Sequence, residues 1–180
     1  LFRSTIAAHT AARLLYSFCM LAFRGLSQTI FTFVSENYGA GLPGRIRKAM
    51  KYAYIFSGVV TVLVTIFIWI FAPAMIRLIS GSQEPVVLQS GTLYLRVVAP
   101  SYFILGVLNN TRRALQAIGQ KILPVFSGMI ELIGKILFTA FFIPKMQYMA
   151  VIICEPVIWC FMVAELLLVF WRDPFIRKGK

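Results

Sequence analysis

Residues 52–76 read YAYIFSGVVTVLVTIFIWIFAPAMI, a run of 25 consecutive positions without a charged side chain. At a rise of 1.5 Å per residue, a helix of this length crosses the hydrocarbon core of a bilayer, which is about 30 Å thick. The run therefore predicts a transmembrane helix, and it makes lipid the solvent of this part of the chain.

The rest of the chain has the same character. Of its 180 residues, 59% are hydrophobic and 13% are charged, which leaves too little polar surface for a water-soluble domain of this size. Four further apolar stretches accompany the first, at residues 6–36, 86–110, 122–143 and 147–171. We predict an all-α integral membrane protein: a polytopic bundle of about five transmembrane helices in one domain over residues 1–180, with connections shorter than about 15 residues.

The chain carries a net charge of +12, and the placement of its Lys and Arg residues decides their role. Short cytoplasmic loops of membrane proteins collect basic residues, so an asymmetry between the two ends of the spans predicts orientation. The side that includes the C-terminus is predicted to be cytoplasmic, and the opposite side holds only Arg3, Arg77 and Lys145. The basic side then contacts membrane lipids, and no nucleic-acid partner is expected. Its eleven residues are Arg45, Arg47, Lys48, Lys51, Arg112, Arg113, Lys121, Arg172, Arg177, Lys178 and Lys180.

Residues that carry enzyme or metal chemistry are scarce. Cys19, Cys154 and Cys160 lie within predicted spans without the spacing of metal ligands, and we interpret them as packing residues. His9 stands alone at the start of the first span, where a helix-start role is favoured over a proton relay. The sequence contains no Gly-rich phosphate loop or nucleophile elbow. It predicts neither an enzyme nor a cofactor, and it leaves a metal site undecided.

Arg24, Asn109 and Asn110 are among the polar residues inside the first and third spans. An arginine at bilayer depth costs about 2.5–3.5 kcal/mol on insertion scales, so Arg24 is expected either to face other helices or a wet cavity, or to snorkel towards an interface. Asn109 and Asn110 could line a path through the bundle, but hydrogen bonding between helices is the favoured interpretation.

Acidic residues mark the fourth and fifth spans. Glu131 and Lys135 lie four residues apart on one helical face, which predicts either a structural ion pair or a carboxylate that exchanges partners as a cavity opens. Pro156 removes a backbone donor and is expected to bend the fifth helix beside Glu155. An unpaired Glu155 could take up a proton near neutral pH and couple it to movement, or it could only hold helices together.

Several motifs resemble those of multidrug and toxic compound extrusion (MATE) transporters. Residues 35–41, Ser-Glu-Asn-Tyr-Gly-Ala-Gly, are similar to the family's Gly-Gln-Asn-x-Gly-Ala-Gly, with Ser-Glu in place of Gly-Gln. Residues 22–24, Ala-Phe-Arg, lie where many relatives have a Pro followed by an apolar residue. Residues 94–96 (Tyr-Leu-Arg), 113–124 (Arg-x-Leu-Gln-x-x-Gly-x-x-x-x-Pro) and 155–159 (Glu-Pro-x-x-Trp) follow in the family's order.

The resemblance covers nearly the whole chain and matches the last five of the family's twelve helices. It implies the C-terminal lobe of a two-lobe transporter, with the N-terminal lobe of the same protein as its partner. The implied function is multidrug efflux: export of small organic cations by antiport with Na⁺ or H⁺, through alternating access, in the plasma (inner) membrane of a bacterium. The candidate site residues are Glu131 and Glu155 for ion coupling, Arg96 and Lys135 as their neutralising neighbours, and Arg24, Asn109 and Asn110 in the cavity.

Two alternatives remain at this point. A lipid-linked precursor flippase of the same superfamily would share the bundle, but it should line a cavity with more cationic residues to hold a diphosphate. A membrane scaffold without transport would explain the spans without charges inside them, and Glu131, Lys135 and Glu155 argue against it.

Overall fold

The computed structural model describes residues 2–81, 84–120 and 122–177, with their side chains except at positions 2–9, 11–12, 143 and 145–148. Arg3, His9 and Lys145 therefore fall outside the described side chains, and Lys121, Lys178 and Lys180 outside the described residues. Every described element is helical: α1 (Phe2–Gly39), α2 (Pro43–Ser80), α3 (Pro85–Val98), the 3₁₀ turn η1 (Ala99–Ser101), α4 (Tyr102–Ala117), α5 (Ile122–Arg172) and α6 (Pro174–Arg177).

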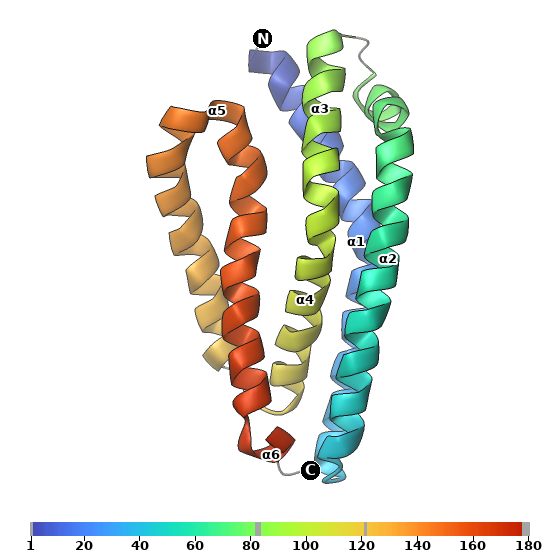
Figure 1. The fold of residues 1–180 in the computed structure, drawn as a ribbon, viewed down its shortest axis with the longest axis vertical. Helices are drawn as coiled ribbons and strands as arrows, with labels where there is room; N and C mark the ends of the chain where they lie inside the picture. The colour runs from blue at the N-terminus through green and yellow to red at the C-terminus, as the bar shows by residue number, and fades with distance from the viewer. Residues whose placement is uncertain (1, 82–83, 121, 178–180) are drawn as a thin grey trace.

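Within the described part of the chain, five helical segments are long and apolar enough to cross a membrane, which confirms the predicted all-α bundle. Helices α1 and α2 supply one each, and α3, η1 and α4 together form the third, Pro85–Ala117. Helix α5 supplies two, because it folds back into two antiparallel legs, Ile122–Phe142 and Met149–Arg172 (Figure 1). The legs meet at Gly134, where an added Cβ would lie 3.1 Å from Ile158 Cγ1.

Two glycines end helices at the same end of the bundle. Gly41 has φ +69° and Gly119 has φ +86°, the left-handed region that favours glycine. After Gly119, the Gln120 N–H donates to the Leu115 carbonyl at 3.0 Å, which is the long bond of a Schellman motif. Pro43 is the first residue of α2, where its fixed φ suits a helix start.

The helices extend beyond the predicted spans. Helix α2 begins at Pro43 rather than residue 52, so the basic segment 45–51 forms its first turns. The predicted spans 122–143 and 147–171 are not separated by a non-helical loop, because the residues at which α5 folds back are themselves helical. Helix α5 also stays helical through Pro156. Apolar length marks only the hydrocarbon core of a bilayer, whereas helical hydrogen bonding continues until a cap ends it, so hydropathy underestimates helix length.

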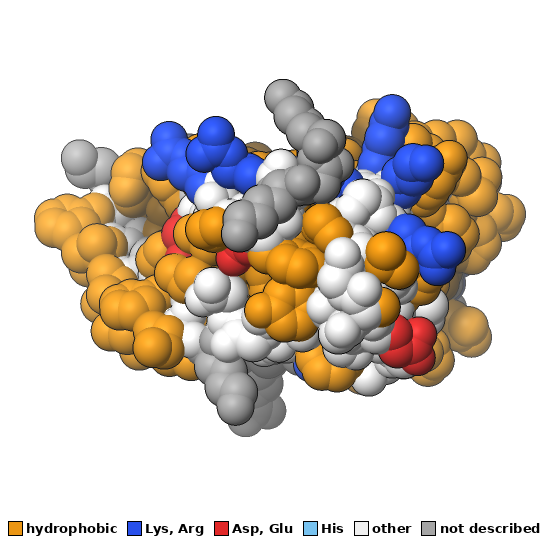
Figure 2. Space-filling view, turned by 90° about the horizontal axis from the view of Figure 1, so that it is seen from below, with side chains coloured by type: hydrophobic (Ala, Val, Ile, Leu, Met, Phe, Trp, Pro, Cys, Tyr) orange, Lys and Arg blue, Asp and Glu red, His pale blue; other side chains and the backbone are white. Residues whose placement is uncertain are grey.

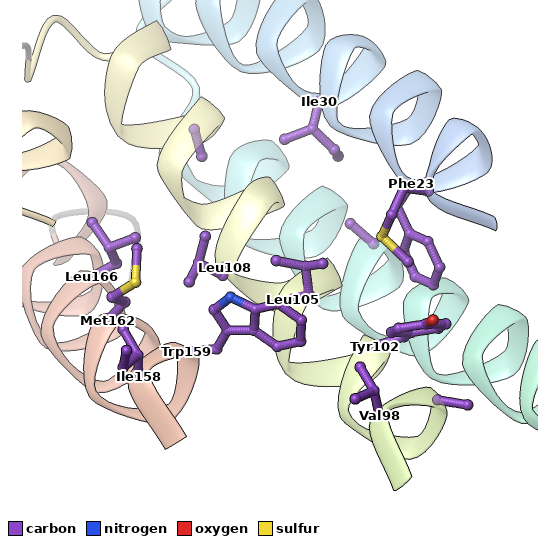
Figure 3. Close-up of a cluster of buried hydrophobic side chains, with 14 of the residues drawn as sticks. Phe23, Ile30, Val98, Tyr102, Leu105, Leu108, Ile158, Trp159, Met162 and Leu166 are labelled. Atoms are coloured by element: carbon purple, nitrogen blue, oxygen red, sulfur yellow. The ribbon is translucent and has the colours of Figure 1, made fainter. Parts of the chain in front are cut away.

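The core lies where α1, α2, α4 and the second leg of α5 meet. Figure 3 shows Phe23, Tyr102 and Trp159 among the clustered side chains of α1, α4 and α5, and all three are buried. Gly106 lets the helices approach closely, since a Cβ there would lie 2.9 Å from Phe23 Cδ1 and 3.0 Å from Ser57 Cβ. Small residues at helix contacts are typical of membrane bundles, in which close packing replaces the hydrophobic effect.

Two kinds of surface suit a bilayer. Helix α2 and the first leg of α5 leave large apolar side chains exposed, among them Leu63, Ile66, Ile70, Leu132 and Ile136. Figure 2, seen from the end that holds the two glycine turns, shows Lys and Arg side chains projecting beside hydrophobic ones. Basic side chains at one end and bare apolar helix sides agree with the predicted membrane topology.

Candidate functional site

Glu155, on the second leg of α5, contacts two other helices through its carboxylate. Arg13 Nη1 on α1 donates to Oε1 at 3.4 Å, and the Tyr94 hydroxyl on α3 donates to Oε2 at 3.4 Å. The Glu155 side chain is 15% exposed, whereas that of Arg13 is 52% exposed. Both contacts are longer than the 2.7–2.9 Å or so of a good charge-assisted hydrogen bond, so a proton or small cation could compete with them.

A cavity of about 230 Å³ opens beside this carboxylate. Lys135 and Thr139 from the first leg of α5 face it together with Arg13, Tyr94 and Glu155. Phe138, Ala150, Val151 and Cys154 complete the lining. A liquid water occupies about 30 Å³, so the cavity holds several waters or a small hydrated ion.

Glu131 and Lys135 form the ion pair that their spacing predicts. Lys135 Nζ lies 2.8 Å from Glu131 Oε1, with the two side chains 43% and 34% exposed. Because Lys135 also lines the cavity of Glu155, the structure brings three of the predicted site residues together. Lys135 could therefore respond to a change of charge at either carboxylate.

Of the two interpretations of Glu155, the structure shows the paired one, since its carboxylate contacts Arg13. The expectation that Arg96 is its neutralising neighbour was wrong. Arg96 instead joins α3 to α2: its Nη2 donates to the Trp69 carbonyl at 3.0 Å, and Trp69 Nε1 donates back to the Arg96 carbonyl at 3.3 Å. Arg96 thus points away from Glu155, because it lies two residues after Tyr94 on α3, which is about 200° around the helix from the side chain that contacts Glu155.

A signal for Arg13 was present in the sequence. Arg13 and Arg24 are 11 residues apart, which is about three helical turns and places them on the same face of α1. An arginine pair on one face of a transmembrane helix indicates that this face avoids lipid. The predictions from sequence named Arg24 but not Arg13, although the two arginines share this face of α1.

Arg24 and Asn109 line a second cavity, of about 510 Å³, between α1 and α4. Arg24 lies about 16 Å along the helix from Arg13 and about 22 Å from Gly39 at 1.5 Å per residue. These distances exceed the reach of an arginine side chain, so the structure favours a cavity-facing Arg24 over a snorkelling one.

Asn110 turns the other way, into the core. It is 1% exposed, its Nδ2 donates to Ser57 Oγ at 3.0 Å, and its Oδ1 accepts from Ser27 Oγ at 2.8 Å. This network joins α1, α2 and α4, which is the helix-to-helix role favoured from sequence. Adjacent Asn109 and Asn110 therefore have different roles, since neighbours on a helix point about 100° apart.

Glu155 and its neighbours are the candidate oxygen ligands for a small cation beside this cavity. Among the described residues, no group of three or more His, Cys, Asp or Glu side chains gathers closely enough to hold a metal ion. One carboxylate with a tyrosine hydroxyl, a threonine hydroxyl and room for water is a weak, exchangeable site. Such a site suits transient binding of a proton or monovalent cation better than a resident metal.

The family model MatE matches residues 3–141, more than half of the chain. The chain belongs to the MatE family. A relative, the FAD transporter of Shewanella oneidensis, is 31% identical over 114 residues, which are 63% of this chain and 25% of the relative. The chain thus spans about a quarter of that relative's length. No solved structure matches it significantly.

Membership of the MatE family confirms the resemblance seen in the motifs. The match ends at residue 141, so it includes Glu131 and Lys135 but not Glu155. The case for Glu155 therefore rests on its geometry: a mostly buried carboxylate held by α1 and α3 beside a cavity.

Proposed function

We propose that this chain is part of a secondary active exporter of organic solutes that exchanges the solute for Na⁺ or H⁺ by alternating access. The observation that carries the proposal is the Glu155 carboxylate, bound loosely by Arg13 and Tyr94 beside a cavity within a MatE-family bundle. A facing lobe from the rest of the protein belongs to the proposal, because two lobes enclose the central site in such transporters.

The coupling step follows from electrostatics. With its carboxylate charged, Glu155 attracts Arg13 and accepts from Tyr94, which holds α5 against α1 and α3. A proton or a sodium ion on the carboxylate weakens the attraction of Arg13. The half-exposed Arg13 guanidinium then turns into the cavity, and α1 is free to move against α5. Ion binding and helix movement are thereby linked through one residue.

The solute is proposed only as a class. The motif resemblance favours organic cations, as in multidrug efflux, whereas the Shewanella oneidensis relative is named for transport of FAD, an organic anion. Both are organic solutes. Export of such molecules is common to the two possibilities, and a flippase or a scaffold without transport has less support from this family.

Glu155→Gln in the full-length protein tests the proposal. Glutamine keeps the shape and hydrogen bonding of the side chain but fixes its neutral state. In proteoliposomes with an imposed Na⁺ or H⁺ gradient, we expect the variant to bind solute and to lose gradient-driven export, measured with ethidium and with FAD. Glu36→Gln is the matched control, since Glu36 is an exposed acid outside both cavities and should export at the wild-type rate.

Two results would count against the proposal. Wild-type export rates in Glu155→Gln would remove Glu155 from coupling. If the wild-type protein exported ethidium and FAD at rates that do not depend on the Na⁺ or H⁺ gradient, secondary transport itself would be contradicted.

A further inference from the structure

The cavity of about 510 Å³ between α1 and α4 is basic. Two arginines, Arg24 and Arg113, line it, and none of its described lining residues is acidic. Gln28 and Asn109 add two amides. Tyr16, Met20, Ser27 and Leu105 complete the lining.

The N–H donors of the two arginines in this cavity have few acceptors among the described residues. Among the described residues, no carboxylate pairs with Arg24, and the guanidinium of Arg113 contacts only the neutral Gln116 Oε1, at 3.3 Å. A guanidinium offers five N–H donors and no acceptor. Two of them in one cavity without an acid create a positive field that favours a ligand rich in acceptors.

The depth of Arg24 excludes lipid tails as its surroundings. It lies near the middle of α1, more than ten residues from either end of its span, Arg13–Gly39. Its face is continuous with Arg13, Tyr16, Met20 and Ser27, which follow one another at helical spacing. This polar stripe on α1 therefore faces water, a solute or the facing lobe.

We propose that this cavity binds the anionic group of an organic solute, with Arg24 and Arg113 holding a phosphate or carboxylate and Tyr16, Met20 and Leu105 contacting its apolar part. The inference rests on the proposed export function and narrows its substrate class to organic anions, in place of the cations expected from the motif resemblance. Arginine suits this role because its planar fork matches the oxygens of phosphate and carboxylate.

Riboflavin 5′-phosphate and riboflavin are suitable probes, since they share one fluorescent ring system and differ by a phosphate. Binding to the purified full-length protein is measured by the change in flavin fluorescence. We expect riboflavin 5′-phosphate to bind at least tenfold more tightly than riboflavin, and we expect Arg24→Gln to remove this difference. Arg113→Gln should reduce it, and Arg24→Lys should restore part of it. Arg45→Gln, an exposed basic residue outside this cavity, is the matched control.

Equal binding of the two flavins by the wild-type protein would overturn the proposal. So would equal losses for both flavins in Arg24→Gln, which would indicate a structural role. Circular dichroism and size-exclusion profiles of each variant establish that it is folded, and Arg113→Gln provides a second test if Arg24→Gln is not.

An anionic lipid headgroup presents the same phosphate, so binding is repeated in nanodiscs of phosphatidylcholine with and without phosphatidylglycerol. A solute site keeps its preference for riboflavin 5′-phosphate in both. Loss of that preference with phosphatidylglycerol would assign the cavity to lipid and overturn the proposal.

The inference and the proposed function fail in different ways. Gradient-driven export of ethidium, with no effect of Arg24→Gln and no binding of riboflavin 5′-phosphate, would overturn the anion site and leave the exporter standing. Binding of riboflavin 5′-phosphate that depends on Arg24, without transport of any solute, would support the anion site and contradict the exporter.

Discussion

At the scale of single residues, the charges inside the bundle differ in how they are compensated. Glu131 has a close partner on its own helix, Glu155 has two loose partners on other helices, and Arg24 has none within the described chain. A charge within a bilayer is costly, so each uncompensated group indicates contact with water, a ligand or another part of the protein. We therefore expect function to depend more on Glu155 and Arg24 than on Glu131.

The unequal burial of Arg13 and Glu155 leads to a stability prediction. Arg13→Gln leaves a carboxylate that is 15% exposed without its cation, whereas Glu155→Gln leaves an arginine that is 52% exposed and can reach water. At neutral pH, we expect Arg13→Gln to lower the free energy of unfolding by about 1–2 kcal/mol. We expect Glu155→Gln to lower it by less than about 1 kcal/mol. Thermal unfolding in detergent, followed by tryptophan fluorescence, measures both.

The double variant Arg13→Gln/Glu155→Gln completes the cycle. It should be less destabilised than the sum of the two single variants, because the second substitution removes the charge that the first left unpaired. Additive losses would show that the pair does not interact in the folded protein.

At the scale of helices, close approach at glycines decides how the bundle packs. Gly106 brings α4 against Phe23 of α1 and Ser57 of α2, and next to it the buried Asn110 bonds to Ser57 and Ser27. The same three helices enclose the core (Figure 3). The packing of α1 on α4 in turn shapes the basic cavity, since Arg24 and Asn109 come from these two helices.

Gly106→Ala tests this packing. The new Cβ would lie 2.9 Å from Phe23 Cδ1 and 3.0 Å from Ser57 Cβ, so the helices must separate, and we expect a loss of about 1–3 kcal/mol in stability. Gly128→Ala on α5 is the matched control: nothing lies within 4 Å of its new Cβ, and alanine favours helix, so stability should be unchanged or slightly higher. Equal effects at both positions would contradict tight packing at Gly106.

At the scale of the whole molecule, charge is distributed unevenly between the two ends of the bundle. Figure 2 shows Lys and Arg side chains at the end with the glycine turns and α6. The helix ends that meet there carry Arg45, Lys48, Arg113 and Arg177. Asp173 caps α6 there, accepting from the Phe175 N–H at 2.9 Å. Basic residues are retained on the cytoplasmic side of membranes, so this end should face the cytoplasm.

Cysteine labelling tests this orientation. In a background without Cys19, Cys154 and Cys160, a membrane-impermeant maleimide should label Glu84→Cys in intact cells, whereas Gly44→Cys should react only after the cytoplasmic side is opened. Glu84 and Gly44 lie at opposite ends of the bundle because α2 runs its full length between them. Labelling on the reverse sides would contradict the predicted orientation.

The sequence by itself determined the features that depend on nearby residues. Apolar length predicted the five spans, and a four-residue spacing predicted the Glu131–Lys135 pair. Each depends on helical geometry within a few turns, which a linear pattern encodes directly.

Only the tertiary structure decided which distant residues meet. Glu155 pairs with Arg13, 142 positions away, while Arg96 turns to Trp69 and Arg24 joins Asn109 in one cavity. These contacts depend on how each helix is rotated about its axis and how closely it packs at residues such as Gly106. Hydropathy is nearly uniform around transmembrane helices, so it carries little information about that rotation, and the packed bundle sets it instead.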